Sequence, residues 1–296
     1  MNSLMYTLNN ADILIASMHQ KEKAIMPAFD AYYNDICRHI ADKLNTDQFW
    51  TFSGEIKRPT DMQNTLSMKI TAALSLYSKY TIAIWTEWSF TSIFPWIVRN
   101  TECIMLQDKR FWYTFSTCYT ATISCPQRFC TNSWCDASEF ILTSFLFPEE
   151  WCIIYPEKYS STLFHRLYNN KNNWITKWIT DLESAKTAFF IASKISSNNK
   201  VIIEPDFRAL FCPQRMKNIV LAANQLIKQI QTSCPNCFSP WWTIKDQEGL
   251  ALCHFCSSVT TYPTHEIRWC QNCAYRVKKE IDILQFPLDS CSICNP

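Results

Sequence analysis

The chain has 296 residues, with 28 Lys and Arg against 26 Asp and Glu, so its formal net charge is +2. A hydrophobic content of 48% and a charged content of 18% exclude a disordered or collagen-like chain, because such chains cannot bury enough apolar surface to fold. The near-neutral charge also removes the simplest argument for nucleic-acid binding, which is an overall basic surplus.

Two residue types are present in unusual numbers. Glycine occurs 2 times and cysteine 16 times, whereas average usage would give about twenty glycines. Phosphate loops of the Walker or dinucleotide type need several glycines, so they are excluded. The first 15 residues lack the basic start and apolar core of a secretory signal, and Glu87 and Pro95 interrupt the most membrane-like window. We therefore expect a cytoplasmic protein without a membrane span, whose cysteines are thiolate ligands rather than disulfides.

Short apolar runs alternate with amphipathic stretches along residues 1–231. The runs that predict strands are Ile13–Ser17, Tyr80–Trp85, Thr101–Gln107, Cys152–Tyr155 and Val201–Glu204. The stretches that predict helices are one that begins near Pro59, Asn173–Phe190 and Pro213–Ile230. This alternation predicts an α/β domain over residues 1–231, with a parallel or mixed sheet.

Eight cysteines gather after about Thr232 in four C-x-x-C pairs. The pairs are Cys234 and Cys237, Cys253 and Cys256, Cys270 and Cys273, and Cys291 and Cys294. Two thiolates three positions apart can hold one ion in a tight turn, and two such turns complete a tetrahedral zinc site with four cysteine ligands. The spacing therefore predicts a C-terminal module of two zinc ribbons over residues 232–296.

The expected pairing of these knuckles is consecutive. The first and second pairs would form one site, and the third and fourth pairs the other; an interleaved pairing, first with third and second with fourth, stays open. Eight ligands for two ions leave no position for a reactive water, so both ions are expected to be structural. The aromatic side chains among the knuckles fit either base stacking or packing of the ribbons: Trp241, Trp242, Phe255 and Trp269.

The other cysteines carry less information. Cys125, Cys130 and Cys135 are spaced five residues apart, with Cys118 and Cys152 on either side. We interpret them as buried free thiols, which behave as small hydrophobes. A third metal site among them is the alternative.

Polar residues interrupt the apolar pattern at four places in the large domain. Lys21 follows the first predicted strand at the start of a helix, where backbone N–H groups and its charge suit an anion. At the second place, the carboxylate residue Glu55 directly follows Gly54. At the third place, Lys69 lies on the apolar face of the helix that begins near Pro59, so it must either snorkel to the surface or meet an acidic or phosphate partner. The fourth place runs from Glu204 to Arg208.

Together these residues predict a site for a phosphorylated ligand with Mg²⁺. Its cations would be Lys21, Lys69, Arg208 and Arg215, and its carboxylates Glu55, Glu87, Glu204 and Asp206. Magnesium prefers a few carboxylates together with phosphate oxygens and water. The alternative interpretation is a set of ordinary surface ion pairs and helix caps.

Five segments in the same order resemble a known family. They are M-H-Q-K-E at 18–22, T-D-Q-F-W-T-F-S-G-E-I-K-R at 46–58, T-E-W-S-F at 86–90, E-P-D-F-R-A-L-F-C-P-Q-R-M at 204–216 and the knuckles that end in C-S-I-C-N-P. They resemble an uncharacterised, mainly bacterial group, domain of unknown function 6671. The resemblance implies that the four cations and four carboxylates above are matching positions. It brings no activity, although the order of elements is similar to that of nucleoside-triphosphate pyrophosphatases, a likeness of fold alone.

The chain departs from the family pattern where glycine is usual. Trp88 replaces a glycine beside Glu87, where its ring could fill the predicted pocket, and Trp50 replaces a small residue. Phe238, Ser257 and Ala274 stand after knuckle cysteines. A left-handed backbone costs a non-glycine residue about 1–2 kcal/mol, so either strain or an altered geometry is expected at these three turns.

The function we expect is binding of a nucleotide or a similar phosphate compound by the α/β domain, with zinc in the ribbons. If the protein is an enzyme, which the sequence leaves open, Glu55 and Glu87 would hold Mg²⁺ or orient water for hydrolysis of a phosphoanhydride. The alternative is a non-enzymatic module that binds nucleic acid or a protein through the ribbons. Nucleic acid is the less favoured of these partners, and no membrane partner is expected.

Overall fold

The computed structural model describes residues 6–15, 19–50, 56–94, 97–124, 128–146, 149–158, 175–179, 181–282 and 291–294. The chain forms two compact units, Asn9–Gln225, and Met1–Leu8 with Leu226–Pro296. Helix α6, Pro213–Ile230, passes through the division. The domain boundary expected at residue 231 stays a prediction. Within the described part of the chain, no helix is both long and apolar enough to cross a membrane.

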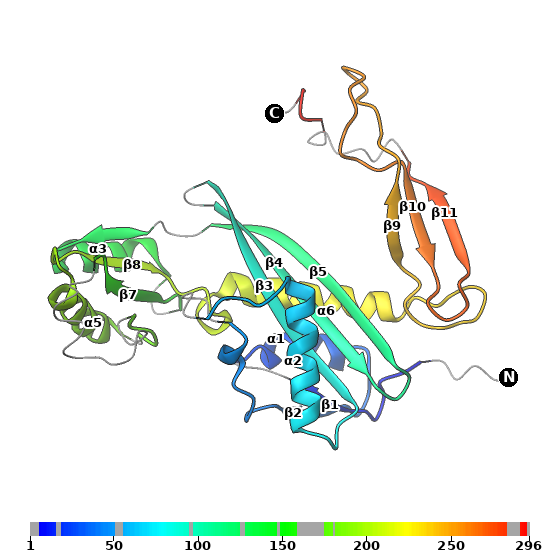
Figure 1. The fold of residues 1–296 in the computed structure, drawn as a ribbon, viewed down its shortest axis with the longest axis horizontal. Coiled ribbons are helices and arrows are strands. Elements are labelled where there is room, and N and C mark those ends of the chain that lie inside the picture. Colours follow the sequence, from blue (N-terminus) through cyan, green and yellow to red (C-terminus); the bar gives the residue numbers. More distant parts are fainter. Residues whose placement is uncertain are drawn as a thin grey trace. The chain divides into compact units, whose positions relative to one another are not determined.

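A five-stranded mixed sheet forms the centre of the unit Asn9–Gln225 (Figure 1). Its order is β2-β1-β3-β4-β5. Strand β1 pairs in parallel with β2 and β3, whereas β4 is antiparallel to β3 and β5. The strands are β1 Asp12–Ile15, β2 Cys37–Ile40, β3 Ile82–Phe94, β4 Ile97–Asp108 and β5 Tyr113–Ser124. The mixed sheet confirms the predicted fold class.

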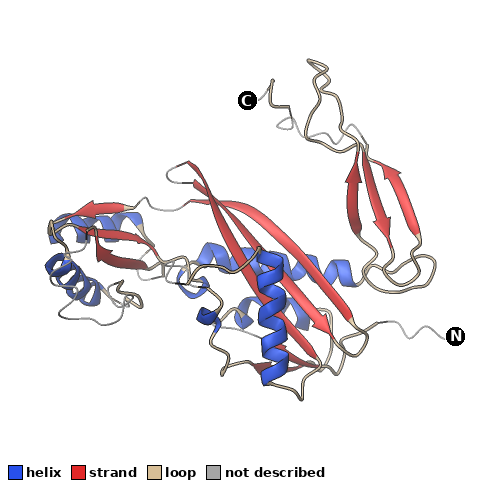
Figure 2. Cartoon of the chain, in the orientation of Figure 1, coloured by secondary structure: helices blue, strands red, loops and turns tan. Residues whose placement is uncertain are grey.

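Helices lie on both faces of this sheet. Helix α1, Glu22–Asp30, connects β1 to β2, and α2, Met62–Leu76, precedes β3. Figure 2 shows α2 in front of the long strands and α6 behind them. Helix α2 begins at Met62 because the Asp61 side chain accepts a hydrogen bond from the backbone N–H of Asn64.

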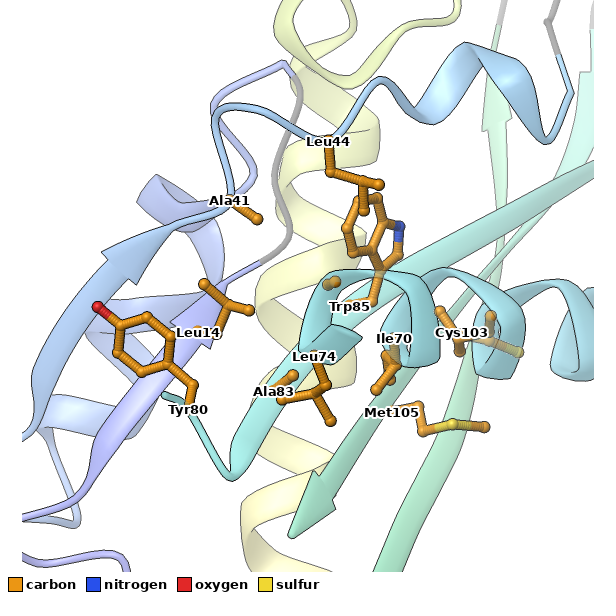
Figure 3. Close-up of a cluster of buried hydrophobic side chains, with 12 residues drawn as sticks. Leu14, Ala41, Leu44, Ile70, Leu74, Tyr80, Ala83, Trp85, Cys103 and Met105 are labelled. Atoms are coloured by element: carbon orange, nitrogen blue, oxygen red, sulfur yellow. The ribbon is translucent and has the colours of Figure 1, made fainter. Parts of the chain in front are cut away.

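The core under α2 is apolar and closely packed. It joins one face of α2 to the first, third and fourth strands of the chain (Figure 3). Burial of such side chains contributes about 1.5–3 kcal/mol each, so this contact fixes the position of α2 on the sheet. Its larger members are Leu14, Leu66, Ile70, Leu74, Trp85 and Met105.

A second, antiparallel sheet of three strands has the order β6-β8-β7. Its strands are β6 Phe129–Thr131, β7 Cys152–Pro156 and β8 Val201–Pro205, and it shares a core with α3 Trp134–Ser144 and α5 Leu182–Ile195. The helix predicted over Asn173–Phe190 is therefore wrong at its start. Asp181 caps α5, and Thr176 forms an antiparallel bridge with Ile154 instead of a helical turn.

The C-terminal unit contains a three-stranded antiparallel sheet with the order β11-β10-β9. The strands are β9 Ile244–Glu248, β10 His265–Trp269 and β11 Arg276–Glu280. Gly249 follows β9 with φ +72, and a Cβ at this position would collide with the Thr264 hydroxyl oxygen. Few apolar side chains are buried here, so the sheet needs further support.

Candidate functional site

The eight knuckle cysteines form two groups of four in the C-terminal unit. One group is Cys234, Cys237, Cys270 and Cys273, and the other is Cys253, Cys256, Cys291 and Cys294. The consecutive pairing that we expected is wrong, and the interleaved pairing is the one observed. The reason is the antiparallel register of β9 and β10, which sets Arg268 opposite Ile244 and so brings the knuckle after β10 to the knuckle before β9.

The sulfur positions fit one tetrahedral ion in each group. Across the first group, Cys234 Sγ lies 3.7 Å from Cys273 Sγ, and the sulfurs of Cys237 and Cys270 are 3.5 Å apart. In the second group, Cys253 Sγ lies 3.8 Å from Cys294 Sγ, and the sulfurs of Cys256 and Cys291 are 3.6 Å apart. A tetrahedron with Zn–S bonds of about 2.3 Å has edges of about 3.8 Å. Two four-cysteine clusters that could hold metal ions, consistent with zinc, are therefore present.

Serine hydroxyls support one thiolate in each cluster. The Ser239 hydroxyl lies 3.3 Å from Cys237 Sγ, and the Ser258 hydroxyl lies 3.3 Å from Cys256 Sγ. These hydrogen bonds are the largest cause that lowers the pKa of both cysteines to about 6. The lowered pKa favours the thiolate, which is the form that binds a metal ion.

Three knuckles end in a left-handed residue that is not glycine. Phe238, Ser257 and Ala274 have φ values of 59, 58 and 57. The backbone N–H of Ala274 donates to the Cys270 carbonyl at 3.0 Å, and the other two knuckles contain the same bond at 2.9 Å. The expected backbone strain at these turns is thus confirmed, because the turn itself imposes this conformation.

A cavity of about 110 Å³ lies in the unit Asn9–Gln225. It is too small for a whole drug-sized ligand, since such pockets are usually about 300–1,000 Å³, but it has room for a phosphate group. Cationic side chains outnumber carboxylates in its lining. The cations are Lys21, Lys69, Lys177, Arg208 and Arg215, and the carboxylates are Asp47, Glu87 and Asp206.

The cavity therefore brings together six of the eight predicted site residues, namely Lys21, Lys69, Glu87, Asp206, Arg208 and Arg215. Glu204 is a described residue that does not line the cavity, and its carboxylate accepts a hydrogen bond from Tyr155 at 2.8 Å. Glu55 lies outside the described residues.

Lys69 and Glu87 form a buried ion pair, with 2.6 Å between Nζ and Oε2. The inward position predicted for Lys69 from helical periodicity is thus confirmed, and its acidic partner is Glu87. Burial lowers the pKa of Lys69, and the Glu87 charge opposes this shift. The other carboxylate oxygen accepts from Trp50 Nε1 at 2.9 Å and lies 3.3 Å from a nitrogen of Arg58. Both oxygens of Glu87 therefore have protein donors.

Arg215 is fully buried against a carboxylate that the sequence analysis missed. Its Nε and Nη2 lie 2.5 and 3.0 Å from the two oxygens of Glu102 on β4. The Asn100 side chain also donates to Glu102, and Asn218 donates to Asn100. A glutamate directly before the apolar residues 103–106 of a predicted strand was the signal that could have indicated this site.

Tryptophan rings cover the guanidinium groups of the cavity. The Trp88 ring lies 4.0 Å from the Arg215 guanidinium carbon, and the Trp178 ring lies 4.1 Å from that of Arg208. Arg208 also pairs with both carboxylate oxygens of Asp206. Such stacking orients a planar cation while its edge stays available for hydrogen bonds. Trp88 therefore lies in the cavity wall beside Glu87, as its position in the sequence indicated.

Lys21 is buried at the entry to α1. Its Nζ lies 3.5 Å from the Thr86 carbonyl oxygen. Burial, followed by the charge of Arg215, lowers its pKa to about 8. The nearby His19 has a left-handed backbone, and burial together with the charge of Lys21 lowers its pKa to about 3. The imidazole is therefore neutral near pH 7, and its Nδ1 has no hydrogen-bond partner among the residues that the structure describes.

The remaining cysteines do not form the alternative metal site in the described part of the chain. Cys103 and Cys118, which face each other on β4 and β5, form a disulfide. The interpretation of Cys118 as a free thiol is therefore wrong, and so is the expectation that the chain has no disulfide, because the strand register places a second cysteine directly opposite Cys118. Cys130, Cys135 and Cys152 are free thiols, but only Cys152 is buried, so the prediction of buried thiols is wrong for Cys130 and Cys135. Cys125 lies outside the described residues.

These features define a mixed α/β protein with two interleaved four-cysteine clusters at its C-terminal end. The chain belongs to the family described as domain of unknown function 6671, whose model matches residues 72–296. This confirms the resemblance drawn from the motifs. The match includes Glu87, Arg215 and all eight knuckle cysteines, whereas Lys21 and Lys69 precede it. No curated protein and no solved structure matches the chain.

Proposed function

We propose that the unit Asn9–Gln225 binds a phosphorylated small molecule, a nucleotide or a similar compound, with a phosphate group of that ligand in the cationic cavity. The observation that carries this proposal is the excess of cations in the cavity lining, five Lys and Arg side chains against three carboxylates. The charges of Glu102 and Glu87 favour the ammonium form of the buried Lys21, whereas those of Arg215 and Lys69 oppose it. Phosphate oxygens would offset the excess of positive charge, and Arg and Lys are the side chains that usually bind them.

The described carboxylates favour binding over Mg²⁺-dependent hydrolysis. Magnesium needs carboxylate oxygens that are free to coordinate it. Both oxygens of Glu87 are held by Lys69 and Trp50, and Asp206 is paired with Arg208. Hydrolysis with Glu87 and Glu55 as the Mg²⁺ ligands would require Glu87 to leave these partners. Turnover is therefore the second outcome that the binding experiment should monitor.

The test is a thermal-shift and turnover assay of the full chain with a panel of nucleoside triphosphates, with and without Mg²⁺. At a ligand concentration 100 times Kd, the free energy of unfolding rises by about 2.7 kcal/mol. This corresponds to a rise in Tm of about 5–10 °C for a unit of this size. Lys21→Met should lose the shift, and Lys43→Met, at an exposed position, should keep it. Neither stabilisation nor turnover with any compound would contradict the proposal.

We also propose that zinc fills both four-cysteine clusters and stabilises the C-terminal unit. Four thiolate ligands per ion leave no open position, so the role is structural. Metal binding requires these eight cysteines to be reduced, as they would be in the cytoplasm, although the Cys103–Cys118 disulfide shows that not every thiol of the chain is in that form. Elemental analysis of protein desalted through a weak chelator should give two equivalents of zinc. Fewer than two equivalents would contradict this assignment.

A protein partner for the C-terminal unit is the second candidate function. Exposed apolar side chains surround the second four-cysteine cluster, and residues 249–264 contain no Asp, Glu, Lys or Arg. A nucleic-acid surface needs cations, so this uncharged region favours a protein over nucleic acid. The exposed side chains are Leu250, Leu252, Phe255, Val259 and Ile293.

Retention on immobilised single-stranded nucleic acid separates these two partners. We expect no salt-sensitive retention of the full chain, and no difference between the native protein and Phe255→Ser. Salt-sensitive retention that Phe255→Ser abolishes would instead favour base stacking by the knuckle.

A further inference from the structure

We propose a third metal site, for a single zinc ion, at the edge of the five-stranded sheet. Its ligands are Asp12 on β1 and Cys37 and His39 on β2. The site is separate from the cationic cavity and from the two four-cysteine clusters. A negative result at this site would therefore leave the functions proposed above unaffected.

The register of the two strands places the three side chains together. Asp12 pairs directly with Cys37, and His39 is two residues further along the same strand as Cys37. Residues two apart on a strand point to the same face of the sheet. One ligand atom from each residue lies within 4.8 Å of the other two. Regular backbone pairing, rather than a loop, holds all three ligands.

The distances and the donor types suit zinc. His39 Nε2 lies 3.7 Å from Asp12 Oδ1, whereas the edge of a tetrahedron with Zn–N and Zn–O bonds of about 2.0–2.2 Å is about 3.4 Å. A change of a few tenths of an ångström therefore brings both atoms to one ion. A thiolate, an imidazole and a carboxylate form a mixed set that zinc accepts and that Mg²⁺ and Ca²⁺ do not.

Two neighbouring residues affect the ligands of this site: Tyr80 orients His39, and Lys79 competes with a metal ion for Asp12. The Tyr80 ring packs against the His39 ring with 4.5 Å between centroids, which limits rotation of the imidazole. Lys79 interacts electrostatically with Asp12 and would compete with a cation for it. Cys37 is exposed, and so are 68% of the Asp12 and 37% of the His39 side chains. Three protein ligands at such an exposed position leave the fourth open to water or a small anion.

The experiment is a cobalt titration of the full chain whose four-cysteine clusters are already filled with zinc. Cobalt bound to a thiolate gives a charge-transfer absorption that reports Cys37 directly. We expect a saturable signal from one equivalent in the native protein and in Cys135→Ser, which removes another exposed free cysteine. The signal should be absent in Cys37→Ser. His39→Gln and Asp12→Asn should each weaken binding at least tenfold.

Lys79→Gln provides an independent test. This variant removes the ammonium group that competes for Asp12, so cobalt should bind more tightly although no ligand has changed. All these positions are at the surface except for the partly covered His39, and circular dichroism should confirm that each variant is folded. A native protein without a saturable signal would overturn the proposal. So would a signal of unchanged strength in Cys37→Ser, which would place the cobalt in the four-cysteine clusters.

Discussion

At the scale of single residues, the charge of the cavity depends on the pH through the protonation of Lys21. Its pKa is lowered to about 8, first by burial, and a bound phosphate would raise that pKa because it stabilises the ammonium form. The protonated form predominates below pH 8 and is lost above it. Binding should therefore be tight near pH 7 and weaken as the pH rises.

The expected loss of nucleoside-triphosphate affinity between pH 7 and pH 9 is about tenfold. The ligand itself does not titrate in this range, because the last phosphate proton dissociates near pH 6. Calorimetric titrations across the range measure the profile. Lys21→Arg is the matched control, since its guanidinium stays charged and should give a flat profile. An equally steep profile in this variant would show that another group is responsible.

Trp88 controls the space in the cavity. It is nearly buried, with its ring against Arg215, Trp50 and Phe90. Trp88→Ala should lower the free energy of unfolding by about 3–5 kcal/mol. It should also enlarge the cavity, so that the affinity for nucleoside triphosphate relative to inorganic diphosphate rises at least tenfold.

Calorimetry with the two ligands measures this ratio, and urea denaturation measures the stability. Trp112→Ala is the control, because Trp112 is 84% exposed and lies outside the cavity. An unchanged affinity ratio in a folded Trp88→Ala protein would show that the ring does not limit the size of the ligand.

At the scale of structural elements, one ion pair joins β4 to α6. Glu102 is fully buried and holds two nitrogens of Arg215. Glu102→Gln would leave the guanidinium buried without its counter-charge, which costs about 3–5 kcal/mol. Urea denaturation followed by circular dichroism should show this loss. Glu248→Gln on exposed β9 removes only surface ion pairs with Arg276 and Lys278, so it should change the free energy of unfolding far less.

The knuckle turns show how an element can impose a conformation against residue preference. Ala274 has φ 57, where glycine would carry no Cβ penalty. Ala274→Gly should therefore raise the stability of the C-terminal unit by about 1 kcal/mol. Gly249→Ala should have the opposite effect, because its Cβ would collide with Thr264. Thermal unfolding of the zinc-loaded protein measures both, and destabilisation by Ala274→Gly would refute the argument from strain.

At the scale of the whole molecule, the two units differ in what stabilises them. The unit Asn9–Gln225 has two extended apolar cores, whereas the C-terminal unit has short strands around two four-cysteine clusters. A strong chelator should therefore unfold the C-terminal unit alone, since structural zinc contributes about 10–16 kcal/mol to the folding of such modules.

Limited proteolysis checks this expectation. Chelated protein should be cleaved after residue 231, and the remaining fragment should keep its helical circular dichroism. Cysteine modification should report eight newly reactive thiols, those of the two clusters. Resistance of the C-terminal unit to proteolysis in chelator would show that apolar packing, rather than metal, maintains it.

Local spacing in the sequence determined several features of this protein correctly. Helix α6 has the predicted bounds, because one apolar stripe and Pro213 mark it. Lys69 points inward, as helical periodicity requires. The four C-x-x-C knuckles form two clusters that could hold metal ions, as their spacing of three indicated. Each of these features depends only on residues within a few turns of one another, so a local pattern can encode it.

Only the tertiary structure decided which distant groups meet. Glu102 is 113 positions from Arg215, Glu87 is 18 from Lys69, and Cys234 is 39 from Cys273. The interleaved pairing of the knuckles follows from the register of β9 and β10, and a strand pattern specifies which face is buried but not which strand lies beside it. The sequence by itself therefore determined the chemical groups and their local geometry. Their partners depended on the pairing of strands and helices, because that pairing minimises the free energy of the whole chain.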